Sequence, residues 1–545
     1  MSSKSKLRAP PPPAETLDTR SSSSSDDGEE LVMAVRHLEG EESDAEEQDS
    51  LLRSETDERE ERQTWVLEHS LGPHRRNGRI TIRGFSLPKP LFYLLSLLPT
   101  LIILNLIFSR SISSSPRHPT LSNGTHAYHP TTLLISLDGF RPPYFSSHAD
   151  LLPNLHALAS HPAGLRAESM QPVFPSLTFP NHWALMTGLY PEEHGIIAND
   201  FWDPDFKGGK GGQFVYTDES KSWDGEWWKG EPVWSVVEKM GRKAAVSMWP
   251  GPPVTSEGVS ASYFVPYRNL APSPKVDQIL QWLDLPLSHR PEFIASYFPE
   301  IDQAGHAHGP DSEEVADALG LLDGMVGDLV RGLEGRNLTG VVDVVIVSDH
   351  GMTRTSNDRL IFLDDILGEG MKDIEHKDGW PSVGIRFNPS LSPSTLSAHI
   401  TTLQNAATQS NGTFGVYTRE SMPERWHFSK SGRIAGVWVV PTLGWGVTDH
   451  HEFEVIHKRD YKPYGNHDVD NIFPDMQAIF FTRGPLARAL RKSGVGLVES
   501  GEPGVPALQS FKNLEIFSLC TKLLGLRDVE PGHNGTEGFW ERWLV

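Results

Sequence analysis

Aspartate and histidine residues flank strand-like apolar segments at four places in this 545-residue chain. They occur in LLISLDG, IDQAGHAHG, VVIVSDHG and YGNHDVD. In open α/β sheets ligands bind beyond the carboxyl ends of the strands, so several of these side chains are expected to meet in one crevice. Carboxylates and imidazoles together suit a dication such as zinc. The candidate metal ligands are Asp138, Asp302, His306, Asp349, His350 and His467.

Each of these residues also has an ordinary structural explanation. Asp138 precedes a glycine, and an Asp-Gly pair after a strand is usually a turn. Asp349 and His350 could form a turn with a helix cap, and His306 and His308 could be loop residues. Six such residues in four segments, each beside a predicted strand, are difficult to explain as unrelated turns and caps. The pattern therefore favours a metal site.

Thr178 lies in SLTFPNHW, at the start of an apolar helix-like stretch that continues through Met186. A threonine at that place is ordinarily an N-cap, whose hydroxyl accepts a hydrogen bond from the backbone. A hydroxyl beside a metal can instead be a nucleophile, because metal coordination activates an otherwise weak one. The residues alone leave both explanations open.

The elements that must position these side chains form an α/β pattern from Thr131 onward. The spacing of apolar residues in Ser312–Leu333 predicts a helix, with Asp311 or Ser312 as its cap. The alternation of strands and helices predicts a mostly parallel central sheet that is flanked by helices on both faces. Strands buried on both faces are predicted at Thr132–Leu137, Phe293–Tyr297, Val341–Ser348 and Met476–Thr482.

The N-terminal part of the chain has a different composition. Residues 1–87 are rich in Ser, Pro and acidic residues without apolar periodicity, which predicts a disordered acidic tail. The apolar run Leu91–Phe108 predicts a transmembrane signal-anchor helix over residues 88–110, followed by a stalk over residues 111–130. Basic residues are more frequent before the run than after it, which predicts a cytosolic N-terminus. Residues 131–545 are then a catalytic domain on the lumenal or extracellular side, at the plasma membrane or a vacuole-like compartment.

The net charge, the cysteine content and the sequons each add information about this chain. The formal net charge of −22 argues against a protein that wraps nucleic acid, which needs a basic surface. Cys520 is the only cysteine, so no intramolecular disulfide can form. Sequons occur only after the predicted span, which agrees modestly with the orientation. The glycosylation candidates are Asn123, Asn337, Asn411 and Asn534.

Six motifs together resemble the nucleotide pyrophosphatase/phosphodiesterase family of the alkaline phosphatase superfamily, in the manner of a fungal type II membrane member. The resemblance runs from about Thr131 to about Gly535, and it implies an alkaline-phosphatase-like α/β fold with two zinc ions. One zinc is implied at Asp302, His306 and His467. The other is implied at Asp138, Asp349 and His350, with Thr178 as both ligand and nucleophile. The motifs are LISLDGFR, SLTFPNHW, TGLYPEEHGII, IDQAGHAHGP, VSDHGM and NHDVDN.

The resemblance also implies residues that contact the substrate. Asn199 matches an asparagine that helps to hold a phosphoryl oxygen, and Phe179, Trp249 and Tyr267 fall where the family frames a nucleoside. Two departures stand out. Leu177 takes the place of a lysine found in some relatives, and the motif NHDVDN replaces the commoner HGYDN form.

The expected function is zinc-dependent hydrolysis of nucleotide phosphodiester and pyrophosphate bonds through a threonine-linked intermediate, releasing nucleoside 5′-monophosphates. The alternatives are a lipid-headgroup phosphodiesterase or a phosphatase on the same scaffold, and a non-catalytic zinc-bearing surface receptor. Occupancy of every expected ligand position argues against the receptor. The expected partners are a small-molecule phosphodiester and a membrane, and nothing in the sequence indicates an obligate protein partner.

Overall fold

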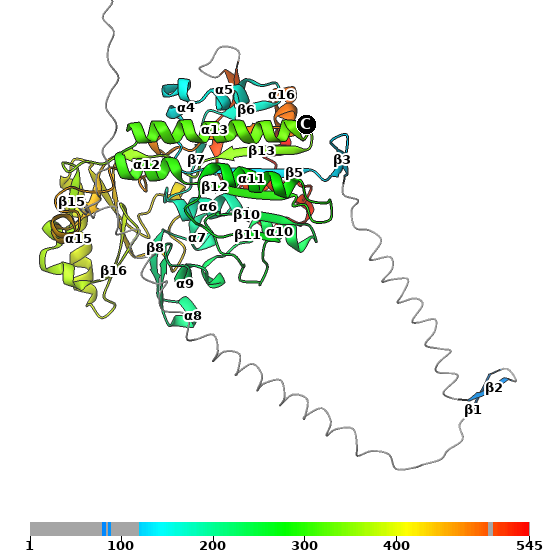
Figure 1. Ribbon diagram of the computed structural model, residues 1–545. Coiled ribbons are helices and arrows are strands. Elements are labelled where there is room, and N and C mark those ends of the chain that lie inside the picture. Colours follow the sequence, from blue (N-terminus) through cyan, green and yellow to red (C-terminus); the bar gives the residue numbers. More distant parts are fainter. Residues whose placement is uncertain (1–78, 83–84, 89–118, 500–504, 544–545) are drawn as a thin grey trace, which may run out of the picture. The chain divides into compact units, whose positions relative to one another are not determined.

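The computed structural model describes residues 79–82, 85–88, 119–499 and 505–543 (Figure 1). The chain before residue 116 and the chain from residue 116 onward form separate units. In the first unit, β1 (Arg79–Ile82) pairs with β2 (Phe85–Pro88) in an antiparallel hairpin at the end of the predicted tail. The predicted transmembrane segment lies outside the described residues apart from Pro88. Among the residues that are described, no helix has both the length and the apolar character needed to cross a bilayer.

The second unit is built around a nine-stranded sheet. At its centre β5 is parallel to β12 on one side and to β13 on the other. All seven residues of β5 are buried. Along the sheet the strands are β11 (Tyr263–Val265), β10 (Ala244–Ser247), β12 (Phe293–Phe298), β5 (Thr131–Leu137), β13 (Val342–Val347), β22 (Phe480–Arg483), β6 (Gly164–Ala167), β24 (Pro506–Leu508) and β23 (Leu497–Glu499).

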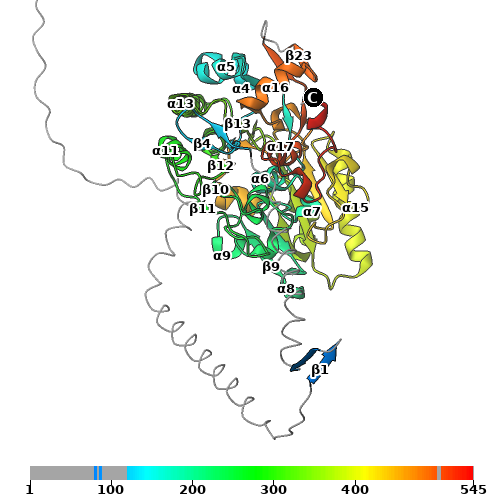
Figure 2. The same ribbon diagram turned by 90° about the vertical axis from the view of Figure 1, so that its right-hand side faces the viewer.

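Helices cover both faces of this sheet (Figure 2). Alternate residues of β5 point to opposite faces, so Leu133 and Ile135 belong to one hydrophobic cluster and Leu134 to the other. The first cluster includes residues of α5 (Pro153–Ser160), α11 (Pro272–Leu283) and α13 (Glu313–Gly335). The second includes residues of α6 (Thr178–Thr187), α10 (Val233–Lys239) and α17 (Glu515–Leu523).

The predicted α/β class is confirmed, and most strand pairs of the central sheet are parallel, but the sheet is mixed. β22 is antiparallel to both of its neighbours, β13 and β6. An apolar run that is buried on both faces reads the same in either direction, so the sequence did not reveal this orientation. The predicted helix after β12 is confirmed as α13, and its N-cap is Ser312, whose Oγ accepts a hydrogen bond from the Val315 amide at 3.3 Å.

The second half of the predicted stalk belongs to the folded unit, so its boundary was wrong. β3 (Leu121–Ser122) and β4 (Ala127–Tyr128) form a short hairpin. Tyr128 is only 3% exposed, and the Arg290 guanidinium lies 3.7 Å from the centroid of its ring. Ser, Pro and His dominate this segment, and its few anchoring side chains were not distinguishable from a linker.

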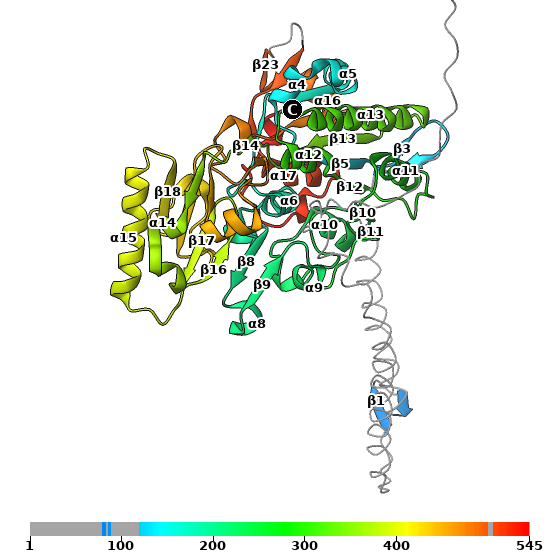
Figure 3. The same ribbon diagram turned by 60° about the vertical axis from the view of Figure 1, so that its left-hand side comes forward.

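A smaller antiparallel sheet adjoins the main one, and the sequence pattern did not predict it (Figure 3). Its core includes residues of α14 (Leu363–Leu367) and α15 (Pro393–Gln409). Its strands are short and differ in how far they are buried, so they share no common pattern of apolar and polar residues that identifies a strand. In order they are β16 (Ile374–Asp378), β17 (Val383–Phe387), β19 (Val437–Pro441) and β18 (Phe414–Thr418).

Asp343 in β13 makes stability depend on pH at a site away from the predicted metal ligands. Its Oδ1 accepts a hydrogen bond from the Leu486 amide at 2.6 Å, in the first turn of α16 (Pro485–Ser493). Burial raises the pKa of Asp343 to about 7, although the Leu486 amide and Arg488 act in the opposite direction. A raised folded-state pKa means that this stabilising contribution is complete below about pH 4 and is lost as the pH rises to about 7.

We therefore expect Asp343→Asn to stabilise the protein above pH 7 by on the order of 2–4 kcal/mol, at about 1.4 kcal/mol per pKa unit. Asparagine keeps the oxygen that accepts from Leu486 but carries no charge. Urea unfolding of both proteins at pH 4.5, 6 and 8 measures the effect. A difference in free energy of unfolding that stays constant across these pH values would contradict it.

Candidate active site

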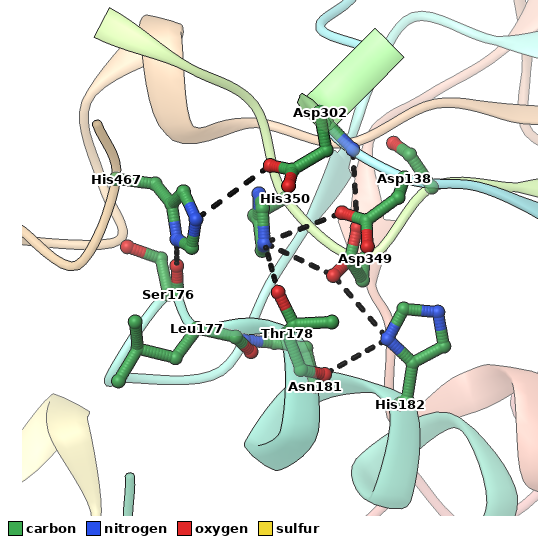
Figure 4. A network of polar contacts seen from close by, with 12 residues as sticks. Asp138, Ser176, Leu177, Thr178, Asn181, His182, Asp302, Asp349, His350 and His467 are labelled. Carbon is green, nitrogen blue, oxygen red and sulfur yellow. Dashed lines mark hydrogen bonds and ion pairs between the residues drawn. The ribbon is translucent and has the colours of Figure 1, made fainter. Parts of the chain in front are cut away.

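All six predicted metal ligands gather at the carboxyl ends of β5, β12 and β13, where the three parallel strands lie side by side. Figure 4 shows five of the six with their polar contacts. Two are supplied by α12 (Glu300–His308), which follows β12, and one comes directly after β21 (Gly465–Asn466). The ligand candidates are Asp138 after β5, Asp302 and His306 on α12, Asp349 and His350 after β13, and His467 after β21.

The first group consists of Asp302, His306 and His467, whose candidate ligand atoms lie within 4.8 Å of one another. His306 Nδ1 is 2.9 Å from the Gly465 carbonyl oxygen, and His467 Nδ1 is 2.7 Å from that of Ser176. A carbonyl oxygen can only accept, so each Nδ1 carries the hydrogen. The two Nε2 atoms face each other at 3.1 Å. Burial lowers the pKa of His467 well below its usual range, and the nearby imidazoles add to this effect. The Nε2 atoms of both rings therefore face one point, an arrangement that a cation stabilises.

The second group is built around His350, which is completely buried. Its Nδ1 is 2.9 Å from the Gly351 carbonyl oxygen, so its Nε2 faces the site. Nε2 lies 3.0 Å from Asp349 Oδ2 and 3.5 Å from Asp138 Oδ1. Candidate ligand atoms of Asp138, Asp302 and His350 also lie within 4.8 Å of one another, so the two groups adjoin.

The charge of the second group fits a bound cation. Burial and the neighbouring Asp349 carboxylate raise the pKa of Asp138 well above its usual range. Burial alone lowers the pKa of His350, but Asp349 outweighs it and the net shift is upward. In the absence of a metal, protons thus offset the buried negative charge. A dication coordinated by the same atoms can replace them.

Thr178 is not the N-cap of its helix. The N-cap of α6 is Leu177, which has extended backbone angles and makes no side-chain capping bond. The Thr178 side chain points into the site, and its Oγ1 lies 3.2 Å from His350 Nε2 (Figure 4). Thr178 is 8% exposed. The N-cap explanation is therefore wrong, and the position of the hydroxyl agrees with the predicted role as ligand and nucleophile.

The predicted substrate contacts occupy different surroundings. Asn199 Oδ1 accepts a hydrogen bond from the Phe179 amide at 3.1 Å, which holds the Asn199 amide group beside the residue that follows Thr178. The Phe179 ring is half-buried and lies edge-on to Tyr216, with 5.3 Å between ring centroids. Tyr267 is 50% exposed, and its hydroxyl accepts from Gln303 on α12 at 3.0 Å.

Trp249 is not open to a substrate. It is only 4% exposed, and its indole N–H donates to the His182 carbonyl oxygen at 3.3 Å. The structure therefore does not bring it together with Phe179 and Tyr267 as a nucleoside-framing residue. Its sequence neighbourhood, SMWPG, did not distinguish a ring at the rim of a site from one packed beneath it.

Two residues that the sequence interpretation missed contact the candidate ligands. His182 is completely buried, and its Nδ1 lies 3.3 Å from Asp349 Oδ2. Tyr297 in β12 donates a hydrogen bond from its hydroxyl to Asp138 Oδ2. A signal for His182 was present, because it follows Thr178 by four residues in a predicted helix and so lies on the same face.

The four glycosylation candidates differ in how free their side chains are. Asn337 and Asn411 are exposed, although Asn337 Nδ2 donates to the Asn123 carbonyl oxygen at 2.7 Å. Asn123 Nδ2 donates to the Arg336 carbonyl oxygen at 2.8 Å, and Asn534 Nδ2 donates to Glu193 at 2.9 Å. Asn411 is thus the candidate whose surroundings best suit a glycan, and modification of all four stays a prediction.

Known proteins are similar to this chain in sequence and in fold. Residues 132–470 match the family described as type I phosphodiesterase / nucleotide pyrophosphatase. An uncharacterised pyrophosphatase/phosphodiesterase of Schizosaccharomyces pombe is 35% identical over 423 residues, which are 77% of this chain and 81% of that protein. Human ectonucleotide pyrophosphatase/phosphodiesterase family member 1 is 35% identical over 413 residues, or 75% of this chain and 41% of the human protein. The chain thus spans less than half the length of that relative.

A solved structure agrees with these matches. The murine ectonucleotide pyrophosphatase/phosphodiesterase 5 superimposes with a TM-score of 0.64 and 26% sequence identity. The alignment covers 76% of this chain and 100% of the murine one. The family match, the sequence relatives and the structural superposition therefore agree with one another. The chain belongs to the type I phosphodiesterase / nucleotide pyrophosphatase family, a family of enzymes.

Proposed function

We propose that this chain hydrolyses phosphodiester and pyrophosphate bonds of nucleotides, with Thr178 as the nucleophile and two bound dications as cofactors. The observation that carries the proposal is the convergence of imidazole nitrogens and carboxylates next to the Thr178 hydroxyl. Buried groups of this kind are costly unless they bind something positive.

Zinc is the proposed metal because imidazole nitrogen and carboxylate oxygen together match its ligand preference. One ion would be held by Asp302, His306 and His467. Two buried oxygen atoms support the second site. Among the residues that the structure describes, neither Asp138 Oδ1 nor Asp349 Oδ2 accepts a hydrogen bond. The proposed ligands of the second ion are Asp138, Asp349, His350 and Thr178. Bound dications lower the pKa of a coordinated hydroxyl and neutralise charge on phosphoryl oxygens.

The residues of the chain would then carry out the reaction in two steps. Thr178 Oγ1 forms a bond to phosphorus while the bond from phosphorus to the first product breaks, and the hydroxyl proton passes to solvent. Water next attacks the phosphothreonyl ester, releases the nucleoside 5′-monophosphate and returns a proton to Oγ1. The Asn199 side chain, whose Oδ1 accepts from the Phe179 amide, would donate from its amide nitrogen to a phosphoryl oxygen.

The relatives support a nucleotide substrate. Those named above are called pyrophosphatase/phosphodiesterases, and the murine structure was also determined as an inactive threonine-to-alanine variant in complex with AMP. The exposed ring of Tyr267 and the half-buried ring of Phe179 offer apolar surfaces on which a base can stack, worth about 1–3 kcal/mol per base.

A comparison of three chromogenic substrates tests the substrate class. We expect the full-length protein to hydrolyse the nitrophenyl ester of thymidine 5′-monophosphate at least about a hundredfold faster, in kcat/KM, than nitrophenyl phosphate or nitrophenyl-phosphocholine, a difference of about 2.7 kcal/mol. Preference for phosphocholine would replace the nucleotide by a lipid headgroup and keep the metals and nucleophile. Zinc binding without turnover of any of the three would favour a receptor.

We also propose that the chain is a single-pass type II membrane protein with a cytosolic N-terminus. This rests on the apolar run and its basic flank in the sequence. The sequons beyond that run agree with a lumenal or extracellular catalytic unit.

A further inference from the structure

His182 sits beneath the candidate active site and joins three of its parts (Figure 4). Its Nδ1 lies 2.8 Å from the backbone carbonyl oxygen of Thr178 and 3.3 Å from Asp349 Oδ2. Its Nε2 lies 2.8 Å from Ser136 Oγ in β5. One imidazole thus contacts the helix that carries the nucleophile, a carboxylate after β13, and the strand that leads to Asp138.

The partners of the ring decide what His182 can do. A carbonyl oxygen and a carboxylate oxygen only accept hydrogen bonds, so Nδ1 must carry a hydrogen. Nε2 is occupied by the Ser136 hydroxyl, which can either donate or accept. His182 therefore has no lone pair available at the atom that faces Asp349. Proximity alone would group His182 with Asp138 and Asp349 as a metal site. The hydrogen bonds exclude it from the ligand set.

Neighbouring aromatic rings restrict the orientation of the imidazole. Trp249 and Tyr297 both lie edge-on to it, each with 5.0 Å between ring centroids. Trp249 also donates to the His182 backbone carbonyl oxygen, and Tyr297 donates to Asp138 Oδ2. The burial of Trp249 thus has a physical explanation, because it supports the ring that contacts Asp349.

We propose that His182 is a positioning residue that links the nucleophile to the second metal site. Its Nδ1–H group donates to the Thr178 carbonyl oxygen in the first turn of α6 and lies 3.3 Å from Asp349 Oδ2, so the ring keeps the helix that carries Thr178 and the Asp349 carboxylate in fixed register. This inference rests on the proposed function, because it assumes a cation at Asp349. Groups that hydrogen-bond a metal ligand fix its orientation, and their loss typically lowers metal affinity or activity by about 10–100-fold.

Two substitutions of similar polarity test the geometry. In His182→Asn the amide nitrogen stands as many bonds from Cα as Nδ1 does, so it can still donate toward Asp349 and Thr178. In His182→Gln the nitrogen reaches the position of Nε2, so the Thr178 carbonyl oxygen loses its donor and Asp349 loses the N–H group beside it. In the full-length protein we expect H182N to keep kcat within about tenfold of wild type. We expect H182Q to lower both kcat and zinc affinity by about 10–100-fold, with KM nearly unchanged.

The readouts are kcat and KM on the thymidine ester, zinc affinity by competition with a chelator, and the melting temperature of the metal-free protein. The same kcat and zinc affinity in H182N and H182Q would overturn the inference. So would losses of kcat and zinc affinity that run parallel to a lower melting temperature. If wild type neither binds zinc nor turns over, the proposed function fails instead. Should H182Q not fold, Ser136→Ala is the second variant. It removes the hydrogen bond at Nε2 and frees the ring to turn, and an unchanged zinc affinity and kcat would equally overturn the inference.

Discussion

Thr178→Ala is expected to lower kcat on the nucleotide ester by at least about a thousandfold while the protein keeps its fold and its metal. The substitution removes only Oγ1 and one methyl group, from a side chain that is already largely buried. The three protein ligands of each proposed ion remain in place. The loss should therefore appear in kcat rather than in zinc content or melting temperature.

Thr178→Ser is the matched control, because it keeps a hydroxyl at the same position and should retain measurable turnover. Rapid quenching of wild type with substrate, followed by mass spectrometry, should find a nucleotidyl group on the peptide that contains Thr178. Turnover by the alanine variant at more than a few per cent of the wild-type rate would mean that the nucleophile is another group, such as water.

Removal of the metal is the second large effect. We expect a chelator to abolish turnover, by at least about a thousandfold, and zinc to restore it. The metal-free protein should also unfold more readily, because the facing nitrogens of His306 and His467 and the carboxylates of Asp138 and Asp349 lose the cation between them. Binding at a thousand times the dissociation constant stabilises a folded protein by about 4 kcal/mol, which is a measurable shift in melting temperature.

Two neighbouring histidines on α12 provide a matched comparison. His306 faces the first group, whereas the His308 side chain is about half exposed and lies 3.5 Å from Glu314. His306→Ala should lose zinc and activity, and His308→Ala should keep both. Equal metal content in the two variants, measured by atomic absorption, would remove His306 from the ligand set. If a metal other than zinc restores activity to the chelator-treated protein, the proposed site stands and the identity of its ion changes.

The sequence predicted the main strands well because they are long apolar runs in the most buried layer. β5, β12 and β13 begin within one residue of their predicted positions. The sequence predicted Asp311 or Ser312 as the cap of α13, and Ser312 is its N-cap. β22 begins four residues later than predicted, because the apolar residues before it are buried in an irregular segment.

Local sequence could not show how the elements orient against one another. The antiparallel direction of β22 and the small sheet of β16 to β19 depend on pairings between distant segments. The same reason explains why the sequence did not predict the burial of Trp249 or the packing of the residues after 120 onto the folded unit. Whether an aromatic side chain lies at a rim, in the core or against a neighbouring strand is decided by packing across the chain.

The sequence by itself determined which residue types were available for chemistry, their order along the chain and the strands beside which they stand. That was sufficient for the family and for the six candidate ligands, because parallel strands must bring their carboxyl ends together. Only the tertiary structure decided which nitrogen of each histidine faces the centre. For His306 and His467 that choice depends on the backbone carbonyl groups of Gly465 and Ser176, which are far away in sequence. For His182 it depends on the contacts of its two ring nitrogens with Thr178, Asp349 and Ser136. Hydrogen bonds between distant segments thus separate a metal ligand from a residue that positions one, and no local pattern records them.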